Sequence, residues 1–382
     1  MNHTRPLVLC LLIVGCSSYE HRAEIAVASE QVLESNLRRH VDALTSIGSR
    51  RAGDGAAGLA TIEYLEGELR LWEIESERES FLLTPSARAT LQVVSTEEGS
   101  GGVVMERELP GVYFGNTISQ SRVAGGFVRA GERLHGIRFE PAESAPVEQI
   151  NLLVTFRGTV RPERVLEISA HHDTVPGTVG ADDNTSGVVV LLEVARMLKE
   201  NPPECTVRLC FFAAEELGLL GAREHVKRMK ANGRIGEVFG LINLDTVGFY
   251  TDEADSQESP ARIPLVVWPP STGNFLAIVG GDGSADLAHL VEFCGETYAP
   301  ELPLYTLARL GGYLPDARRS DHAPYWDEEI PAVFLTDTAE FRSDRYHRPE
   351  DNVESLNFFQ LRNVAALTLA SALAATALEV EE

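Results

Sequence analysis

The segment from Val165 to Gly187, VLEISAHHDTVPGTVGADDNTSG, constrains the fold more than any other part of the sequence. Its pattern predicts a short apolar strand, then a polar loop with glycines, then the start of a long apolar helix. This order is typical of an open α/β sheet, in which ligands bind at the carboxyl ends of the strands. The loop collects imidazoles and carboxylates, namely His171, His172, Asp173, Asp182 and Asp183.

The crowding of carboxylates in this loop creates an electrostatic problem. Buried like charges repel one another and lose their hydration, so they need either protonation or a multivalent cation. Imidazole and carboxylate together form a ligand set that suits Zn²⁺. We therefore interpret the loop as half of a metal site and expect the other half elsewhere in the chain.

Predicted strands and helices alternate along the rest of the chain. Apolar runs predict strands at 151–158, 165–171, 206–214, 239–244 and 330–335. Apolar residues at helical spacing predict helices at 29–48, beyond residue 55, at 188–198, 220–230 and 358–377. This alternation predicts an α/β fold, a three-layer sandwich with a mostly parallel central sheet flanked by helices. Residues 84–148 consist of short alternating runs broken by glycines and prolines, which predicts a β-rich insertion.

The N-terminus has the features of an export signal. An apolar run from Leu7 to Val14 follows Arg5 and is shorter than the roughly 20 residues that span a bilayer. Residues 13–16, Ile-Val-Gly-Cys, resemble the cleavage box of bacterial lipoproteins, with an ordinary signal peptide as the alternative. We therefore expect cleavage before Cys16, a lipid anchor on Cys16, a tether over 16–28 and a location at the cell envelope.

Composition narrows the classes of partner. The chain has 382 residues, of which 44% are hydrophobic, so it can bury a large core in one or two domains. Its net charge of −24 argues against binding to nucleic acid or to an anionic membrane surface. We therefore expect membrane contact only through the anchor. Beyond the N-terminal segment, the cysteines are Cys205, Cys210 and Cys294, whose spacing predicts no disulfide framework.

Further metal-binding side chains follow the other predicted strands. The full set is His171, Asp183, Glu215, Glu216, Asp245 and His347. Because parallel strands bring their carboxyl ends to one edge of a sheet, we expect these residues to converge. The carboxylates of Asp183, Glu216 and Asp245 offset most of the charge of two Zn²⁺ ions, and the remainder favours a bound hydroxide for hydrolysis.

Each of these residues also has a simpler explanation. A carboxylate at the end of a strand often caps a helix or lies on the surface. Asp182 is a candidate cap for the following helix, and His172 is expected to line the loop without contacting metal. Four histidines on predicted helices or in the insertion are expected to be structural: His40, His135, His225 and His289. The recurrence at separate strand ends favours the metal site over these alternatives.

Six blocks together resemble the di-zinc aminopeptidase family. They are AHHDTV, GADDNTSG, FFAAEELGLLGAR, NLDTVG, SDHAPYW and YHRPED, in this order and spacing. The family includes secreted bacterial aminopeptidases, glutamate carboxypeptidases, glutaminyl cyclase and the transferrin receptor ectodomain. The resemblance covers a metallopeptidase domain over 29–382, except for the insertion at 84–148.

The resemblance implies two Zn²⁺ ions per chain. His171 and Asp245 would hold one zinc, Glu216 and His347 would hold the other, and Asp183 would bridge them. Glu215 would be the general base. Asp173 would orient the imidazole of His171. The block with Ser320, Asp321 and His322 would lie near the substrate pocket, in a role that the resemblance does not assign.

The implied function is that of a zinc-dependent exopeptidase, an aminopeptidase acting on peptide substrates. Glutaminyl cyclase, a carboxypeptidase or a dipeptidase of the same fold are the enzymatic alternatives. A cyclase would keep a single zinc and depart from the GADDN pattern, which is intact here. A non-enzymatic binding module would have lost ligands, whereas all five metal positions are filled.

Overall fold

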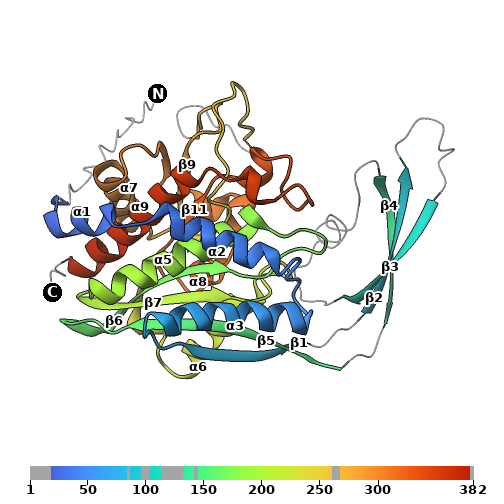
Figure 1. Cartoon of the computed structure of the whole chain (residues 1–382), viewed down its shortest axis with the longest axis horizontal. Helices are drawn as coiled ribbons and strands as arrows, with labels where there is room; N and C mark the ends of the chain where they lie inside the picture. Colours follow the sequence, from blue (N-terminus) through green and yellow to red (C-terminus); the bar gives the residue numbers. More distant parts are fainter. Residues whose placement is uncertain are drawn as a thin grey trace, which may run out of the picture.

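The computed structural model describes residues 19–83, 87–95, 104–112, 132–141, 145–259 and 267–378. The expected signal peptide, residues 1–15, and the expected lipid attachment site at Cys16 lie outside the described residues. A large sheet lies between two layers of helices (Figure 1). The predicted three-layer α/β sandwich is therefore confirmed.

The sheet has eight strands. They are β1 (Glu77–Leu83), β5 (Val147–Phe156), β6 (Arg161–His171), β7 (Cys205–Phe212), β8 (Val238–Leu244), β9 (Leu276–Gly280), β10 (Leu304–Leu307) and β11 (Ala332–Thr336), in the order β1-β5-β7-β6-β8-β11-β9-β10. The central strands β7, β6, β8 and β11 run parallel. β5 pairs antiparallel with both β1 and β7, and β9 pairs antiparallel with β11. The sheet is thus mixed, with a parallel centre that carries the predicted site.

The two helical layers differ in size. The larger layer contains α1 (Ala23–Glu30), α2 (Glu34–Ser46), α3 (Gly55–Leu71), α5 (Gly187–Glu200), α7 (Ala285–Tyr298) and α9 (Phe358–Ala377), and the smaller contains α6 (Leu220–Ala231) and α8 (Ala323–Asp327). Successive residues of a strand face opposite layers. Leu166 of β6 packs against the larger layer and Val165 against the smaller one. α9 is long and apolar enough to span a membrane, but 72% of that segment is buried inside the protein, as expected of a core helix.

The N-terminal helices depart from the sequence prediction. The predicted helix at 29–48 is two helices, α1 and α2, and most of α1 lies in the range that was expected to be a tether. Ile25 and Ala28, three residues apart, bury one side of α1 in the core. Tyr19 also donates a hydrogen bond to the backbone oxygen of Asp286, 2.9 Å away. Residues of the expected tether, from Tyr19 onward, are therefore part of the folded domain.

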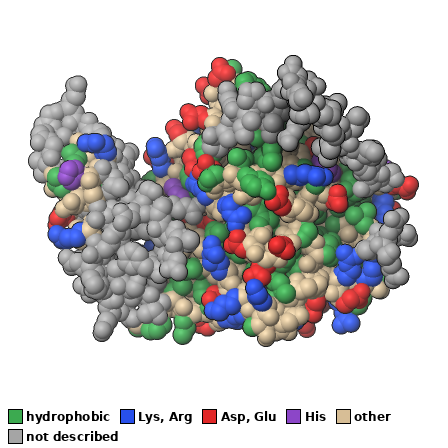
Figure 2. All heavy atoms as spheres, turned by 180° about the vertical axis from the view of Figure 1, so that it is seen from behind, with side chains coloured by type: hydrophobic (Ala, Val, Ile, Leu, Met, Phe, Trp, Pro, Cys, Tyr) green, Lys and Arg blue, Asp and Glu red, His purple; other side chains and the backbone are tan. Residues whose placement is uncertain are grey.

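The predicted β-rich insertion contains a second, three-stranded antiparallel sheet. Its strands are β2 (Ala87–Ser95), β3 (Val104–Val112) and β4 (Glu132–Pro141), in the order β3-β2-β4. The sheet projects from the body between the end of β1 and the start of β5, where Leu83 pairs with Val147 (Figure 1). On the body, acidic, basic and apolar side chains are intermixed over the face seen in Figure 2.

Candidate metal centre

The parallel strands bring the predicted site residues to one edge of the sheet. His171 is the last residue of β6, and Asp183 lies in the turn before α5. Glu215 and Glu216 follow β7, and Asp245 follows β8. His347 lies in the loop beyond β11. Since these four strands are parallel neighbours, all of the predicted metal-binding side chains lie at their carboxyl ends.

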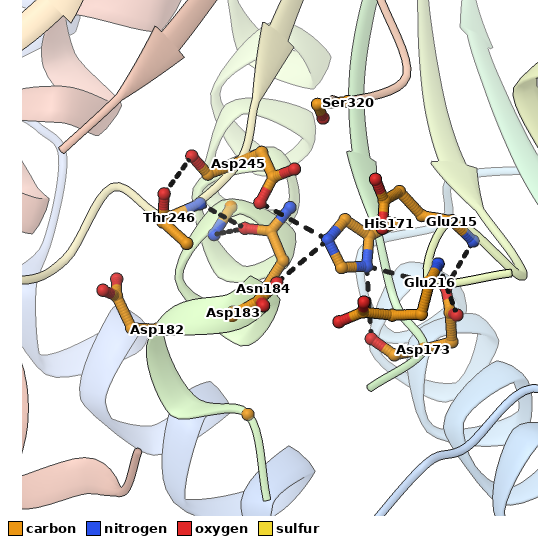
Figure 3. A network of polar contacts seen from close by, with 12 residues as sticks. His171, Asp173, Asp182, Asp183, Asn184, Glu215, Glu216, Asp245, Thr246 and Ser320 are labelled. Atoms are coloured by element: carbon orange, nitrogen blue, oxygen red, sulfur yellow. Dashed lines mark hydrogen bonds and ion pairs between the residues drawn. The ribbon is translucent and has the colours of Figure 1, made fainter. Parts of the chain in front are cut away.

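Two groups of side chains share the carboxylate of Asp183. His171 Nε2 lies 3.2 Å from Asp183 Oδ1 and 3.4 Å from Asp245 Oδ1 (Figure 3). His347 Nε2 lies 3.0 Å from Asp183 Oδ2 and 3.3 Å from Glu216 Oε2. The potential ligand atoms of each group lie within 4.8 Å of one another. Asp183 thus presents one oxygen to each group, as a bridging ligand does.

The donor atoms of these groups fit a bound cation. His171 Nε2, His347 Nε2 and both carboxylate oxygens of Glu216 are buried without a hydrogen-bond partner among the described residues. Leaving buried polar atoms unpaired costs about 1–3 kcal/mol each, so these atoms need a ligand. Imidazole nitrogens and carboxylate oxygens are the donors that zinc takes in catalytic sites. The residues present therefore fit Zn²⁺.

The electrostatics of the cluster also favour a bound cation. Burial by itself lowers the pKa of His347, but the carboxylates of Glu216 and Asp183 raise it to about 10. Burial likewise opposes the charge on His171, yet Asp245, Asp173 and Asp183 raise its pKa well above the usual range. A field that stabilises protons on both imidazoles also attracts metal cations.

Asp173 connects the two halves of the cluster. Its carboxylate accepts hydrogen bonds from the backbone N–H groups of Glu215 at 3.0 Å and Glu216 at 3.3 Å. His171 Nδ1 lies 3.2 Å from the backbone oxygen of Asp173 and 3.5 Å from its carboxylate. Asp173 therefore positions the glutamate loop as well as the imidazole, and the sequence suggested only the second contact.

Several supporting residues were not predicted. The carboxylate of Asp351 accepts hydrogen bonds from the N–H groups of Asp182 at 2.8 Å and Asp183 at 3.1 Å. Asn184, which follows Asp183 through a cis peptide bond, donates to the backbone oxygen of Leu244 at 2.8 Å. These contacts join the loop after β6 to the end of β8. Asp351 and Asn184 lie in quoted blocks, but their partners are distant in the sequence.

Arg50 also supports the loop, and no sequence signal marked it. Its side chain is buried and donates to the backbone oxygens of His172 at 2.9 Å and Val179 at 2.8 Å. It also donates to Thr185 Oγ1 at 2.7 Å. A single guanidinium thus ties the loop between α2 and α3 to both ends of the metal-binding loop.

His172 and Asp182 are the two loop residues that were given roles other than metal binding, and the structure treats them differently. His172 Nε2 lies 3.0 Å from the backbone oxygen of Ile150 and does not join the cluster, as expected. Asp182 does not cap α5, so that alternative is wrong. Its carboxylate instead accepts the N–H of Gly248 at 2.8 Å and hydrogen-bonds to Asp337. The backbone turn between Asp182 and α5 carries the carboxylate away from the helix terminus.

The block at 320–322 lies beside the cluster. Ser320 Oγ accepts a hydrogen bond at 2.8 Å from the side chain of Asn243, two residues before Asp245. His322 stacks on Phe334 and therefore packs in the interior. Both carboxylate oxygens of Asp321 are buried without a hydrogen-bond partner among the described residues. Burial raises the pKa of Asp321 well above its usual range, which favours the neutral acid.

Four histidines that were expected to be structural lie away from the cluster. His40 Nδ1 lies 2.8 Å from the hydroxyl of Tyr64. His289 pairs with Glu292 on α7, and His135 is exposed on β4. His225 lies between Glu79 and Glu167 on the opposite side of β6 from the larger helical layer. None of these side chains contributes to the cluster around Asp183.

A pocket of about 150 Å³ adjoins Asp245. Apolar side chains from β9, β10 and β11, such as Ala277, Leu307 and Phe334, form much of its lining. Glu258, Asp316, Arg319, Glu340 and Tyr346 also line it. Tyr346 stacks on the metal-binding candidate His347, with ring centroids 3.8 Å apart. The pocket therefore begins at the cluster and extends under the β9–β10 end of the sheet.

Relatives of known sequence match about half of the chain. The protein YfbL of Escherichia coli, an uncharacterized protein, is 33% identical over 206 residues, 52% of this chain and 62% of YfbL. Aminopeptidase YwaD of Bacillus subtilis is 28% identical over 211 residues, 54% of this chain and 40% of YwaD. The matched region spans 40–62% of the length of these curated relatives.

Solved structures share the fold over nearly the whole chain. The zinc aminopeptidase BSAP from Bacillus subtilis has a TM-score of 0.65 at 18% identity, covering 91% of this chain and 96% of that one. A glutaminyl cyclase from Fimbriiglobus ruber has a TM-score of 0.57 at 16% identity, covering 90% and 96%. Residues 151–372, more than half of this chain, match the family described as Peptidase family M28. The chain belongs to peptidase family M28, which confirms the zinc-peptidase resemblance of its six blocks.

Proposed function

We propose that this protein is a zinc-dependent aminopeptidase that binds two Zn²⁺ ions. The observation that carries the proposal is the pair of ligand groups that share Asp183, His171 and Asp245 on one side and Glu216 and His347 on the other. A shared carboxylate is the arrangement that holds two metals side by side. Zinc in these positions supplies Lewis acidity toward the scissile carbonyl and lowers the pKa of water.

Glu215 is the proposed general base. It is buried next to the ligand Glu216, and Asp173 holds the backbone N–H groups of both residues. Glu216 directs its carboxylate toward His347, so the two adjacent glutamates have separate roles. Glu215 takes a proton from the attacking water and returns it to the leaving amine, which balances the proton over the reaction.

The charge around the pocket favours an amino terminus over a carboxyl terminus. Asp245, Glu258, Asp316 and Glu340 line it, and Arg319 is the one cation among its described lining residues. Arg319 pairs with Glu340 and lies 3.7 Å from Asp316, so carboxylates already compensate its charge. This surplus of negative charge attracts a protonated α-amine and repels a terminal carboxylate. An aminopeptidase therefore fits better than a carboxypeptidase.

Two variants of the neighbouring glutamates test the assignment. We expect Glu215→Gln to keep the wild-type zinc content and to lower kcat by about 10²–10⁴-fold, because only proton transfer is lost. We expect Glu216→Ala to lose zinc as well as activity, because a ligand is removed. Zinc per chain is measured by mass spectrometry of the purified protein. If Glu215→Gln loses zinc or keeps near-normal kcat, the two roles are assigned wrongly.

A substrate panel tests the reaction class. We expect hydrolysis of L-leucine p-nitroanilide and of dipeptides blocked at the carboxyl end, and no hydrolysis when the amino end is acetylated. Cleavage of amino-blocked dipeptides alone would identify a carboxypeptidase. One tightly bound zinc together with cyclisation of N-terminal glutamine would identify a glutaminyl cyclase.

We also propose export with a lipid anchor on Cys16, supported by the apolar segment and the Ile-Val-Gly-Cys sequence at 13–16. Two or more acyl chains at that cysteine give stable attachment, whereas one gives only marginal binding. Mass spectrometry of the mature N-terminus is the test. An unmodified N-terminus that begins beyond Cys16 would contradict the anchor.

A further inference from the structure

We propose that the edge of the sheet opposite the metal cluster lies against a phospholipid bilayer, so that the metal cluster faces away from the membrane. This inference rests on the proposed lipid anchor at Cys16 and adds an orientation to it. We call the edge where the central parallel strands begin the amino edge, and the edge that carries the metal cluster the metal edge. The inference depends on where the N-terminal segment is attached, how short the chain before it is, and what the two edges expose.

The N-terminal segment is attached at the amino edge. Arg22 Nη1 lies 3.4 Å from the carboxylate of Glu204, which directly precedes β7. Glu204 also lies 3.8 Å from Arg161, the first residue of β6. Tyr19 donates to the backbone oxygen of Asp286 in the first turn of α7, and α7 begins at this edge because β9 before it runs antiparallel to β11. The described chain therefore starts at the amino edge, and Figure 1 shows α1 at the opposite end of the molecule from the inserted sheet.

The length of a central strand separates the two edges. β6 runs from Arg161 at the amino edge to the candidate ligand His171 at the metal edge. Its 11 residues rise by about 3.3 Å each, so the strand is roughly 30 Å long. A group that is fixed beside Arg161 is therefore about 30 Å from the metal cluster.

The chain between the proposed anchor and this attachment is short. Only Ser17 and Ser18 separate Cys16 from Tyr19. Three residues of fully extended chain reach about 10 Å at most. An acyl group on Cys16 therefore holds Tyr19, and with it the amino edge, within about 10 Å of the bilayer surface. The domain can tilt about this point, but it cannot turn over unless Tyr19 and Arg22 leave their partners.

The amino edge exposes side chains that suit the surface of a phospholipid layer. Val160, in the turn between β5 and β6, is 63% exposed, and Arg157 in the same turn is also exposed. Leu378, whose backbone oxygen accepts a hydrogen bond from Arg161 at 2.7 Å, is 42% exposed. Apolar side chains next to cations are the combination found at membrane interfaces. The anchor supplies the binding, and the amino edge fits the surface against which it is held.

The charge of the metal edge opposes a tilt toward the membrane. The chain has a net charge of −24, and the pocket at this edge exposes the carboxylates of Glu258, Asp316 and Glu340. An anionic leaflet repels these groups once they come within the Debye length, about 8 Å at physiological ionic strength. An upright domain, with its metal edge farthest from the bilayer, is therefore the favoured orientation.

This orientation selects substrates by their origin. A peptide that is attached to the same bilayer must bring its amino end to a metal cluster about 30 Å above the amino edge. Extended chain spans at most 3.3–3.6 Å per residue, so such a peptide needs about nine residues. Soluble peptides have no such restriction. The substrate class is thus peptides of the aqueous compartment, and short chains that emerge from the enzyme's own membrane are excluded.

Fluorescence quenching measures the orientation. The acylated protein, verified by mass spectrometry, is reconstituted into vesicles of phosphatidylethanolamine and phosphatidylglycerol that carry nitroxide on some headgroups. One label is attached through Val160→Cys at the amino edge. The matched label is attached through Leu82→Cys, an equally exposed apolar position near the end of β1, where β5 starts at the metal edge. The described cysteines are buried and do not compete for the label. We expect the nitroxide to quench the label at 160 and to leave the label at 82 unquenched.

A longer tether should remove the orientation. A flexible linker of about 20 Gly and Ser residues between Ser18 and Tyr19 has an r.m.s. length of roughly 25 Å and should reduce quenching at 160. The matched control carries the same linker after Glu382, where it adds the same bulk without lengthening the tether, and should keep the wild-type quenching.

Peptides tethered to the same vesicles test the consequence for substrates. Two leucyl peptides, of roughly five and fifteen residues, are attached to headgroups through their carboxyl ends, so that only the longer can span the distance. We expect the zinc-loaded wild type to cleave the short one about tenfold more slowly or less, because a tether that cannot span the gap gives almost no effective concentration. The variant with the linker before Tyr19 should cleave both. Soluble L-leucine p-nitroanilide should be hydrolysed equally by both proteins.

The outcomes separate the orientation from the proposals on which it rests. An unmodified N-terminus beyond Cys16 would overturn the anchor and the orientation together. Acylated protein with equal quenching at 160 and 82, or with stronger quenching at 82, would overturn the orientation alone. Equal rates of the wild type on the two tethered peptides would also overturn it. Absence of cleavage of every substrate would overturn the aminopeptidase alone, because the quenching measurement requires no turnover.

Discussion

Two clusters of histidine and carboxylate lie on this sheet, and they have opposite characters. The edge cluster consists of His171, Asp183, Glu216, Asp245 and His347. The inner cluster lies between the sheet and the smaller helical layer and consists of Glu79, Glu167, Arg208, His225 and Tyr325. In both places three potential metal ligands lie within 4.8 Å of one another; at the inner cluster these are Glu167, His225 and the neighbouring Cys210. Proximity of ligand types therefore does not distinguish a metal site from a structural network.

The difference lies in the partners of the carboxylates. Glu167 accepts a hydrogen bond from Arg208 at 2.6 Å and another from the Tyr325 hydroxyl at 2.5 Å. His225 lies 3.2 Å from both Glu167 and Glu79, so the inner cluster balances two carboxylates with two cations. In the edge cluster, by contrast, both carboxylate oxygens of Glu216 have no hydrogen-bond partner among the described residues. The guanidinium of Arg208 neutralises Glu167 in the inner cluster. In the edge cluster the charge of Glu216 is left for a metal cation to neutralise.

The pKa values record the same contrast. Burial lowers the pKa of His225, but Glu167 and Glu79 raise it to about 9. Burial raises the pKa of Glu167, but His225 and Arg208 lower it to about 2. Across neutral pH the inner cluster therefore holds its own opposite charges. It is a buried ion-pair network, which stabilises the fold only while every partner is present.

The largest expected difference between the clusters is in zinc content. We expect His171→Ala to lose zinc and to lower kcat/KM by several orders of magnitude, because a proposed ligand is removed. We expect His225→Ala to keep the wild-type zinc content and kcat, because its imidazole serves only the ion pairs. Metal analysis and steady-state kinetics on the two variants measure this. Zinc loss in His225→Ala with the fold intact would make the inner cluster a metal site.

A second difference concerns the cost of removing one charge. Glu167→Gln leaves Arg208 buried without its counter-charge, and we expect the free energy of unfolding to fall by about 3–5 kcal/mol. Replacing both Glu167 and Arg208 with methionine should lower the free energy of unfolding by less, because no unpaired charge remains buried. Denaturant titration of zinc-loaded protein measures both values. Equal losses in the single and double variants would mean that the pair contributes packing and no electrostatic interaction.

Zinc removal should destabilise the edge cluster alone. Zinc at 100-fold above its dissociation constant stabilises the folded state by about 2.7 kcal/mol. We therefore expect a chelator to lower the melting temperature of the wild type and of Glu167→Gln by similar amounts. A melting curve unchanged by chelation would contradict convergence of the edge carboxylates.

The smallest expected effect is in the pH dependence of stability. The pKa of His225 is raised above its ordinary value of 6.5 to about 9 in the folded protein. Its contribution is therefore fully present below pH 6.5 and is lost as the pH rises through 9. We expect the free energy of unfolding to fall over this interval. His225→Gln should remove that slope, and a slope that persists must come from another group.

The convergence of the candidate ligands was largely predictable because they follow strands whose apolar sequence is visible. His171, Glu216 and Asp245 each end or follow a buried run, and the parallel centre of the sheet brings such positions together. The elements between Leu276 and Leu307 were not predicted: β9, α7 and β10. β9 is a short strand that pairs antiparallel with β11, and no alternation of strand and helix signals such a pairing. The pocket that these strands build was therefore invisible in the sequence.

Sequence alone determined which residue types stand at the strand ends, the α/β alternation and the zinc-peptidase character of the edge cluster. Tertiary structure alone decided which carboxylates are already neutralised. Glu167 and Arg208 pair across neighbouring strands, and Tyr325 reaches Glu167 from α8. The physical reason is that charge compensation depends on distance in space. In this chain the compensating groups are separated by up to 158 positions in the sequence.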